Sequence, residues 1–122
     1  MLTAVSGKYA VIVDKRKVEG HTVLRVEGIV KLGESAEFLA QTLRRALDQE
    51  EGHVLLDLSA INYMDSTGIG ELVGYLTRFR NQNRKLILID PSPRITKLLA
   101  VAQVDSLFPI YGSVDEALAA EK

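Results

Sequence analysis

The sequence predicts one α/β domain, in which a mixed sheet of about five strands is flanked by about four helices in the order ββαβαβαβα. Two short, almost wholly apolar segments, at residues 53–58 and 86–90, are typical of strands buried on both faces. Longer segments before, between and after them repeat apolar residues at helical spacing. With 122 residues, 47% of them hydrophobic, the chain can bury a core, and we expect a single domain over residues 1–122, its core at about 9–120.

The chain opens with a predicted antiparallel hairpin. Residues 9–13 are rich in β-forming residues, residues 23–27 alternate apolar with polar side chains, and Glu19 and Gly20 lie at the turn. A helix follows, because apolar residues recur at intervals of three and four at Ala36, Leu39, Ala40, Leu43 and Leu47.

Capping residues and prolines define the later elements. The strand that begins at residue 53 is expected to end near Leu58, and a loop then leads to a second helix at about 66–81. Ser92 and Pro93 are an N-cap and first residue for a third helix, with Ile95, Leu98, Leu99 and Ala102 facing inward. Pro109 places residues 107–111 at a sheet edge, and Ser113 and Glu116 form a capping-box pattern before a last helix.

Composition excludes several classes of function. The chain has no cysteine, so it can form neither disulfides nor thiolate metal sites, and its net charge of −1 offers no basic field for nucleic acid. No apolar stretch approaches the roughly 20 residues that span a bilayer, and the N-terminal residues lack the pattern of a secretory signal. We expect a cytoplasmic protein that needs no cofactor, binds no nucleic acid and does not insert into a membrane.

The segment around Ser66 is the candidate site. It lies after a predicted strand, where functional groups of open α/β sheets gather. Asp65 or Ser66 can cap the second helix, and an ordinary cap is one interpretation. Gly68, Gly70 and Gly74 argue for more, since each glycine costs a helix about 0.5–1 kcal/mol relative to alanine.

A helical projection at about 100° per residue separates a core face from a stripe of small residues. The stripe consists of Ser66, Gly70, Gly74, Thr77 and Asn81. Either a neighbouring loop of the same domain or a partner protein packs closely against it. A phosphate on Ser66 would lie at a helix N-terminus, where we expect unpaired N–H groups to favour an anion, and it would repel a partner without unfolding the domain.

Residues 57–72 resemble the STAS domain family, and within it the bacterial anti-sigma factor antagonists. The Asp-Leu-Ser triplet at 57–59, the aromatic Tyr63 and the run Asp65-Ser66-Thr67-Gly68-Ile69 carry the resemblance, and the element order extends it over roughly 9–120. It implies a STAS-like fold without enzymatic activity. It also implies a cycle in which the unphosphorylated protein sequesters an anti-sigma factor that is a serine/threonine kinase. The kinase then phosphorylates Ser66, with Thr67 as the alternative acceptor, and a serine phosphatase resets the protein.

The residues expected to bind the partner are Asp65, Ser66, Thr67, Gly68, Gly70, Gly74 and Thr77. One departure from the family pattern is Lys31, because many antagonists carry an acidic residue in the loop after the second strand. This departure leaves open a role in a larger stress-signalling assembly. A cytoplasmic STAS regulatory subunit of a transport system is the other alternative.

Enzymatic alternatives find little support. The serine hydrolase motif Gly-x-Ser-x-Gly lacks its first glycine here, and the only two histidines, His21 and His53, fit surface or structural roles and are too few for a metal cluster. Asp57 and Asp90 stand near predicted strand ends, as in aspartyl-phosphate receivers, but the other acidic and lysine residues of such a site are missing.

Overall fold

The computed structural model describes residues 2–5 and 12–121. The elements follow the predicted order, with one strand added at the front and a short 3-10 helix before the last strand. They are β1 (Leu2–Val5), β2 (Ile12–Val18), β3 (His21–Val30), α1 (Glu34–Gln49), β4 (Val54–Met64), α2 (Ser66–Arg80), β5 (Leu86–Ile89), α3 (Pro93–Val101), η1 (Asp105–Leu107), β6 (Ile110–Tyr111) and α4 (Val114–Ala120).

The strands form one mixed sheet in the order β1-β2-β3-β4-β5-β6, so the predicted fold class is confirmed. β1, β2 and β3 pair antiparallel, whereas β3 to β6 pair parallel. β1 was not predicted, and residues 9–11 of the first predicted strand lie outside the described residues. The predicted turn between β2 and β3 is confirmed: Glu19 and Gly20 have φ angles of 50° and 82°, both positive as in a type I′ turn.

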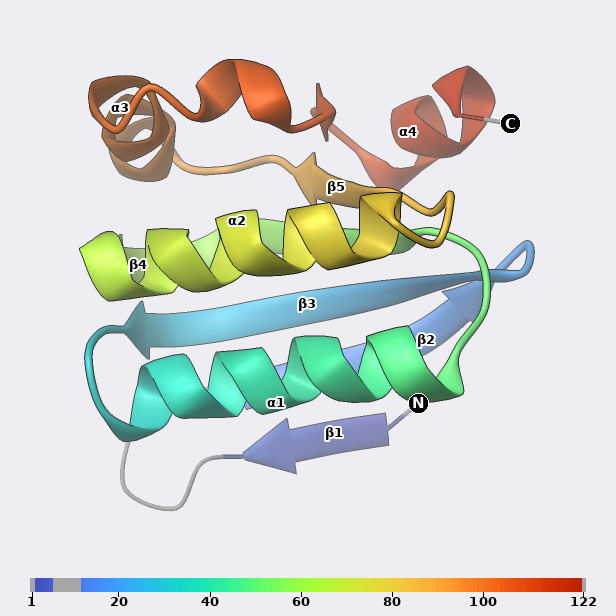
Figure 1. Cartoon of the computed structure of the whole chain (residues 1–122), viewed down its shortest axis with the longest axis horizontal. Coiled ribbons are helices and arrows are strands. Elements are labelled where there is room, and N and C mark those ends of the chain that lie inside the picture. The colour runs from blue at the N-terminus through green and yellow to red at the C-terminus, as the bar shows by residue number, and fades with distance from the viewer. Residues whose placement is uncertain (1, 6–11, 122) are drawn as a thin grey trace.

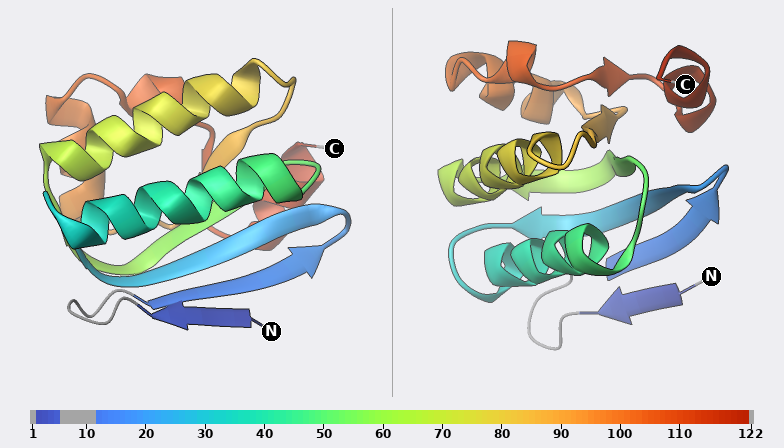
Figure 2. Two further views of the ribbon diagram at one scale, coloured as in Figure 1. Left: turned by 60° about the horizontal axis from the view of Figure 1, so that its bottom comes forward. Right: turned by 45° about the vertical axis from the view of Figure 1, so that its right-hand side comes forward.

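Two apolar layers cover the sheet. α1 and α2 lie side by side across one face (Figure 1) and pack on Leu56, Leu58 and Leu88, and Ile95 and Leu99 of α3 join the same cluster. On the opposite face, Ala117 of α4 packs on Leu55 and Ile87. The two further views in Figure 2 show the sheet between these layers. The central strands are therefore buried on both faces, as their apolar runs predicted.

β4 is longer than the sequence indicated. The expected end near Leu58 is wrong, because the strand continues to Met64 and pairs with β3 as far as Val30. The register between β3 and β4 shifts twice along this stretch, and buried Ile61 and Met64 fix the end of the strand to the core. As a result, Asp65 is the only residue between β4 and α2.

The predicted starts of α3 and α4 are confirmed. The Ser92 side chain accepts a hydrogen bond from the N–H of Ile95, and the Ser113 side chain accepts one from the N–H of Glu116. The Glu116 carboxylate in turn accepts from the N–H of Gly112, one residue before the cap, which closes a variant of the capping box. Of the α3 residues expected to face inward, Ala102 is exposed, because the helix ends at Val101.

The two histidines terminate one end of the sheet. His21, His53 and Lys85 directly precede Thr22, Val54 and Leu86, which occupy one register row of β3, β4 and β5. The Nδ1 of His21 accepts a hydrogen bond of 2.8 Å from the N–H of His53, and the Nδ1 of His53 accepts one of 3.0 Å from the N–H of Lys85. The rings stack with centroids 4.9 Å apart, which matches the spacing between neighbouring strands.

These two hydrogen bonds form a histidine ladder from His21 through His53 to Lys85. The ladder requires neutral rings, and it requires the turn at Gly20 to approach the loop at Gly52 closely. Both Nδ1 atoms accept, so neither can carry a proton without losing its hydrogen bond. Burial, with added repulsion from His21, Lys85 and Arg84, lowers the pKa of His53 and outweighs the attraction of Glu121. Gly52 lies at φ 76°, and a Cβ there would come within 2.5 Å of the Gly20 carbonyl oxygen.

The ladder predicts that stability falls in mild acid. Because the folded protein binds fewer protons at His53 than the unfolded chain does, the free energy of unfolding should decrease as the pH drops below about 6.5, the usual pKa of histidine. Urea unfolding at pH 7.5, 6.5 and 5.5 measures this decrease. His53→Asn keeps an acceptor near the Nδ1 position and cannot titrate, so its unfolding should depend less on pH over this range. Equal pH dependence of the two proteins would contradict the prediction.

Candidate functional site

Asp65 joins three parts of the chain at the C-terminal end of β4. One carboxylate oxygen, Oδ1, accepts hydrogen bonds from the N–H groups of Thr67 and Gly68, at 3.0 and 3.2 Å, and so caps α2. The other oxygen, Oδ2, accepts a 2.9 Å hydrogen bond from the N–H of Leu32, in the loop between β3 and α1. The Asp65 N–H donates to the carbonyl of Val30 at 3.1 Å. The aspartate therefore fixes both the helix start and the neighbouring loop.

The Asp65 carboxyl is held in its ionised form. Burial alone would raise its pKa, but the hydrogen bonds from Leu32, Gly68 and Thr67 outweigh burial, and the pKa lies below its usual value. Asp65, rather than Ser66, is thus the N-cap, and the Ser66 side chain is left exposed at the first position of the helix.

The stripe of small residues on α2 is bare in the described part of the chain. Ser66, Gly70, Gly74 and Thr77 are all exposed. A Cβ added at Gly70 or Gly74 would have no described atom within 4 Å. The interpretation that a neighbouring loop of the domain packs here is therefore wrong for the described residues. No contact among them explains why these two helix positions lack a side chain.

Gly68 differs from the other two glycines. It is buried, and an added Cβ would lie 2.6 Å from Met64 Cγ and 3.1 Å from Val30 Cγ1. Both neighbouring side chains belong to the core, so they have little room to move. Gly68, which we expected to permit close docking of a partner, faces the interior of the domain and is explained by packing of α2 on the sheet.

The three glycines should respond to alanine in opposite ways. Gly70→Ala and Gly74→Ala should each raise the free energy of unfolding by about 0.5–1 kcal/mol, because alanine favours the helix and meets no neighbour. Gly68→Ala should lower it, since overpacking a core costs about 1–3 kcal/mol and exceeds the gain in helix propensity. Urea unfolding of the three variants tests this difference. Destabilisation by Gly70→Ala or Gly74→Ala would show that the stripe is not bare.

Exposed apolar side chains gather at the same end of the sheet. Leu32 is 76% exposed, and Ile29 and Tyr63, which occupy one register row of β3 and β4, are 46% and 41% exposed. These three are half of the six large hydrophobic residues that are exposed in the described part of the chain. The sequence analysis did not assign a role to Leu32. An apolar residue in a short polar loop, between Lys31 and Gly33, is the signal that could have pointed to it.

The remaining candidate residues have local structural roles or stay at the surface. Asp57 lies inside β4, and its Oδ1 accepts from the N–H and the hydroxyl of Ser59. Thr77 donates its hydroxyl to the Val73 carbonyl, one turn earlier in α2. Among the described residues, no group of three or more acidic or histidine side chains is placed to hold a metal ion. None of the described helices combines the length and apolarity needed to cross a bilayer.

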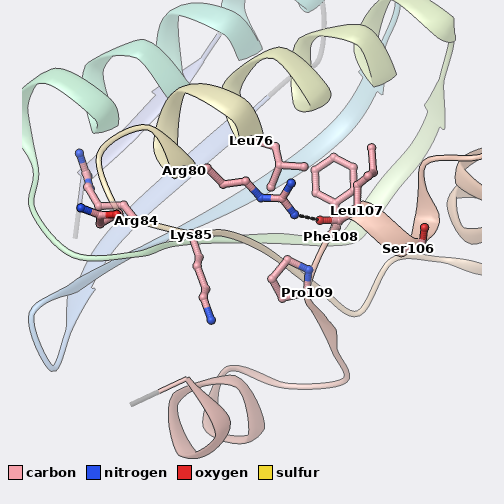
Figure 3. Close-up of a pocket in the computed structure, with 9 residues that line it drawn as sticks. Leu76, Arg80, Arg84, Lys85, Ser106, Leu107, Phe108 and Pro109 are labelled. Atoms are coloured by element: carbon pink, nitrogen blue, oxygen red, sulfur yellow. Dashed lines mark hydrogen bonds between the residues drawn. The ribbon is translucent and has the colours of Figure 1, made fainter.

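A hollow of about 590 Å³ lies at the opposite end of α2 from Ser66. Its cationic side chains already have partners. Arg80 points at the Leu107 carbonyl and donates to it at 2.6 Å (Figure 3), and Lys85 pairs with Glu121. Arg84 donates to the carbonyl oxygens of Ala46, Leu47 and Gly52. The hollow is thus separate from the site around Ser66, and its charges hold the fold together.

Comparisons with known proteins agree with this fold. The model of the STAS domain matches residues 13–117. The anti-sigma-B factor antagonist of Listeria monocytogenes is 33% identical over 82 residues, which cover 64% of this chain and 72% of that protein. The structure of an anti-sigma factor antagonist from Mycobacterium paratuberculosis has a TM-score of 0.78 at 20% identity and covers 95% of this chain and 97% of that one.

A further structural match is SpoIIAA, a Bacillus cell fate determinant, in its phosphorylated form. It has a TM-score of 0.69 at 18% identity and covers 90% of this chain and 99% of that chain. At these identities the solved structures show the shared fold. The chain therefore belongs to the STAS domain family. Within that family it is similar to bacterial anti-sigma factor antagonists, as the resemblance of residues 57–72 implied.

Proposed function

We propose that this protein is an anti-sigma factor antagonist that binds a kinase-type anti-sigma factor and releases it when Ser66 is phosphorylated. The observation that carries the proposal is an exposed serine directly after an ionised helix cap, on a helix face that Gly70 and Gly74 leave bare. In this proposal the protein is a binding partner and a phosphorylation substrate, not an enzyme. A separate serine phosphatase restores the binding form.

The bare face of α2 suits close approach by a partner. Gly70 and Gly74 are one turn apart on the exposed side of the helix, and without side chains there the helix backbone can come into contact with another protein. Two glycines in a helix of 15 residues cost about 1–2 kcal/mol of helix propensity together. Contact with a partner gives that cost a reason, which no described contact within the domain supplies.

Asp65 explains why a phosphate on Ser66 would interfere with the partner. We expected the N–H groups at the start of α2 to be unpaired and to receive the phosphate, but those of Thr67 and Gly68 donate to Asp65. A phosphate adds about −1.5 to −2 charges, and the adjacent carboxylate repels it from the helix end. The phosphate would therefore project into the docking surface, by which we mean the exposed stripe of Ser66, Gly70, Gly74 and Thr77 on α2. There it excludes the partner by its size, its charge and its hydration.

Exposure favours Ser66 over Thr67 as the acceptor. The Ser66 side chain is exposed, whereas Thr67 is half-buried one position further along the helix. A kinase must surround the acceptor hydroxyl to transfer a phosphoryl group, so the residue at the rim is the better substrate. In this proposal Thr67 supports the helix start, where its N–H binds Asp65.

Phosphorylation should abolish binding without unfolding the protein. The Ser66→Ala protein is first used to capture the kinase from a lysate of the source organism, and the kinase is then purified. Wild type and Ser66→Ala should both bind it, but ATP should release only wild type. Ser66→Glu should bind at least about tenfold more weakly, because it adds charge at the rim, while its circular dichroism spectrum stays native. Mass spectrometry of the released wild type should place the phosphate on Ser66.

Three outcomes would contradict the proposal. The first is capture of transport proteins in place of a kinase-type anti-sigma factor, which would favour a regulatory subunit of a transport system. The second is equal binding by the wild-type protein, Ser66→Glu and the authentic phosphoprotein. The third is a phosphate on Thr67, which would move the acceptor by one residue. Thr67→Ala is the matched control, because it should still be phosphorylated and released.

A further inference from the structure

We infer that Leu32 is an apolar anchor for the kinase-type anti-sigma factor, and that Asp65 is a positioning residue that holds Leu32 in place for binding. This inference rests on the proposed function, since it names how the same site would grip its partner. It assigns Asp65 a second role, distinct from capping α2 and from any contact with the kinase itself.

Leu32 is the most exposed large hydrophobic residue in the described part of the chain, at 76%. Apolar side chains of this size are usually buried, and one standing alone at a surface needs no special reason. Ile29 and Tyr63 lie at the same end of the sheet, but they alternate with the buried Val30 and Met64 and so point to the face away from α2. Leu32 is distinguished by its position: its N–H binds Asp65, which directly precedes the acceptor serine. The partner expected at Ser66 is therefore within reach of Leu32.

Hydrogen bonds hold the backbone around Leu32, while its side chain is exposed. The Lys31 N–H donates to the Ser35 hydroxyl oxygen at 2.9 Å, and the Lys31 carbonyl accepts from the Ser35 hydroxyl and from the Ala36 N–H. The Leu32 N–H donates to Asp65. A loop held in this way presents its side chain in one place. A partner that buries Leu32 then loses little conformational freedom on binding, which favours affinity.

The two carboxylate oxygens of Asp65 separate the two roles. Oδ1 caps the helix and Oδ2 binds the Leu32 N–H. In Asp65→Asn the side-chain oxygen can still cap α2, because asparagine is as good an N-cap as aspartate, but the NH₂ group then faces the Leu32 N–H and cannot accept from it. Asp65→Ser also caps the helix and has no second oxygen for Leu32. Both variants should fold while releasing the loop.

The test combines hydrogen exchange with a double-mutant cycle. Without ATP, Leu32→Ala should weaken binding of the purified kinase by about tenfold or more, as truncation of a buried anchor does. The control is Leu107→Ala in η1, which lies near the end of α2 remote from Ser66, and it should change binding less than twofold. Asp65→Asn and Asp65→Ser should each speed amide exchange at Leu32 by at least about tenfold and weaken binding. In the Leu32→Ala background, Asp65→Asn should cost nothing further, because Asp65 acts through Leu32.

The possible failures are distinguishable. If wild type does not bind a kinase-type anti-sigma factor, the proposed function fails, and exchange at Leu32 still reports whether Asp65 holds the loop. If wild type binds and Leu32→Ala binds equally well, the anchor is overturned while the proposed function stands. If the losses from Asp65→Asn and Leu32→Ala add in the double variant, Asp65 contacts the partner by itself and the positioning role is overturned.

Discussion

The arrangement of the site depends on one carboxylate that accepts three backbone hydrogen bonds from two separate elements. Asp65 can do this because it lies where β4 ends, beside the end of β3, and its own N–H binds the Val30 carbonyl. Hydrogen bonds to a charged acceptor contribute more than those between neutral groups, about 1.5–3 kcal/mol each against about 1 kcal/mol. A serine or threonine cap could hold the helix start, but its single oxygen could not also hold the loop at Leu32.

The position of Asp65 in turn depends on β4 being long. Ser59 and Asn62 break the apolar run of the strand, which is why the sequence predicts its end near Leu58, and the strand continues because β3 remains alongside as far as Val30. Met64 then enters the core beneath Gly68, where no larger residue would fit. The contact between Met64 and Gly68 sets how closely α2 lies on the sheet. The buried glycine and the exposed glycines of α2 thus serve different requirements within one helix.

Local features of the fold were predictable from the sequence, and features that depend on pairing were not. The caps at Ser92 and Ser113 and the turn at Glu19 are set by neighbours in the chain, so their residue types identify them. The bond between Leu32 and Asp65 joins residues 33 positions apart, and the histidine ladder joins residues 32 apart. No periodicity encodes such pairs. The stripe on α2 was readable as a pattern, but only the structure shows that described residues leave it bare and that Gly68 belongs to the core.

The two ends of the parallel strands use side-chain acceptors in the same way and respond to different chemistry. At one end, the Nδ1 atoms of His21 and His53 accept backbone N–H groups, and in mild acid a proton competes for the lone pair of His53 that binds the Lys85 N–H. At the other end, the acceptor is the Asp65 carboxylate, whose lowered pKa keeps it ionised throughout the range in which histidine titrates. Mild acid therefore acts on His53, at the end remote from Ser66, while Asp65 keeps the charge with which it holds Leu32 and the start of α2. In the proposed function, a phosphate on Ser66 would act at the opposite end, where the adjacent Asp65 carboxylate would repel it from the start of α2.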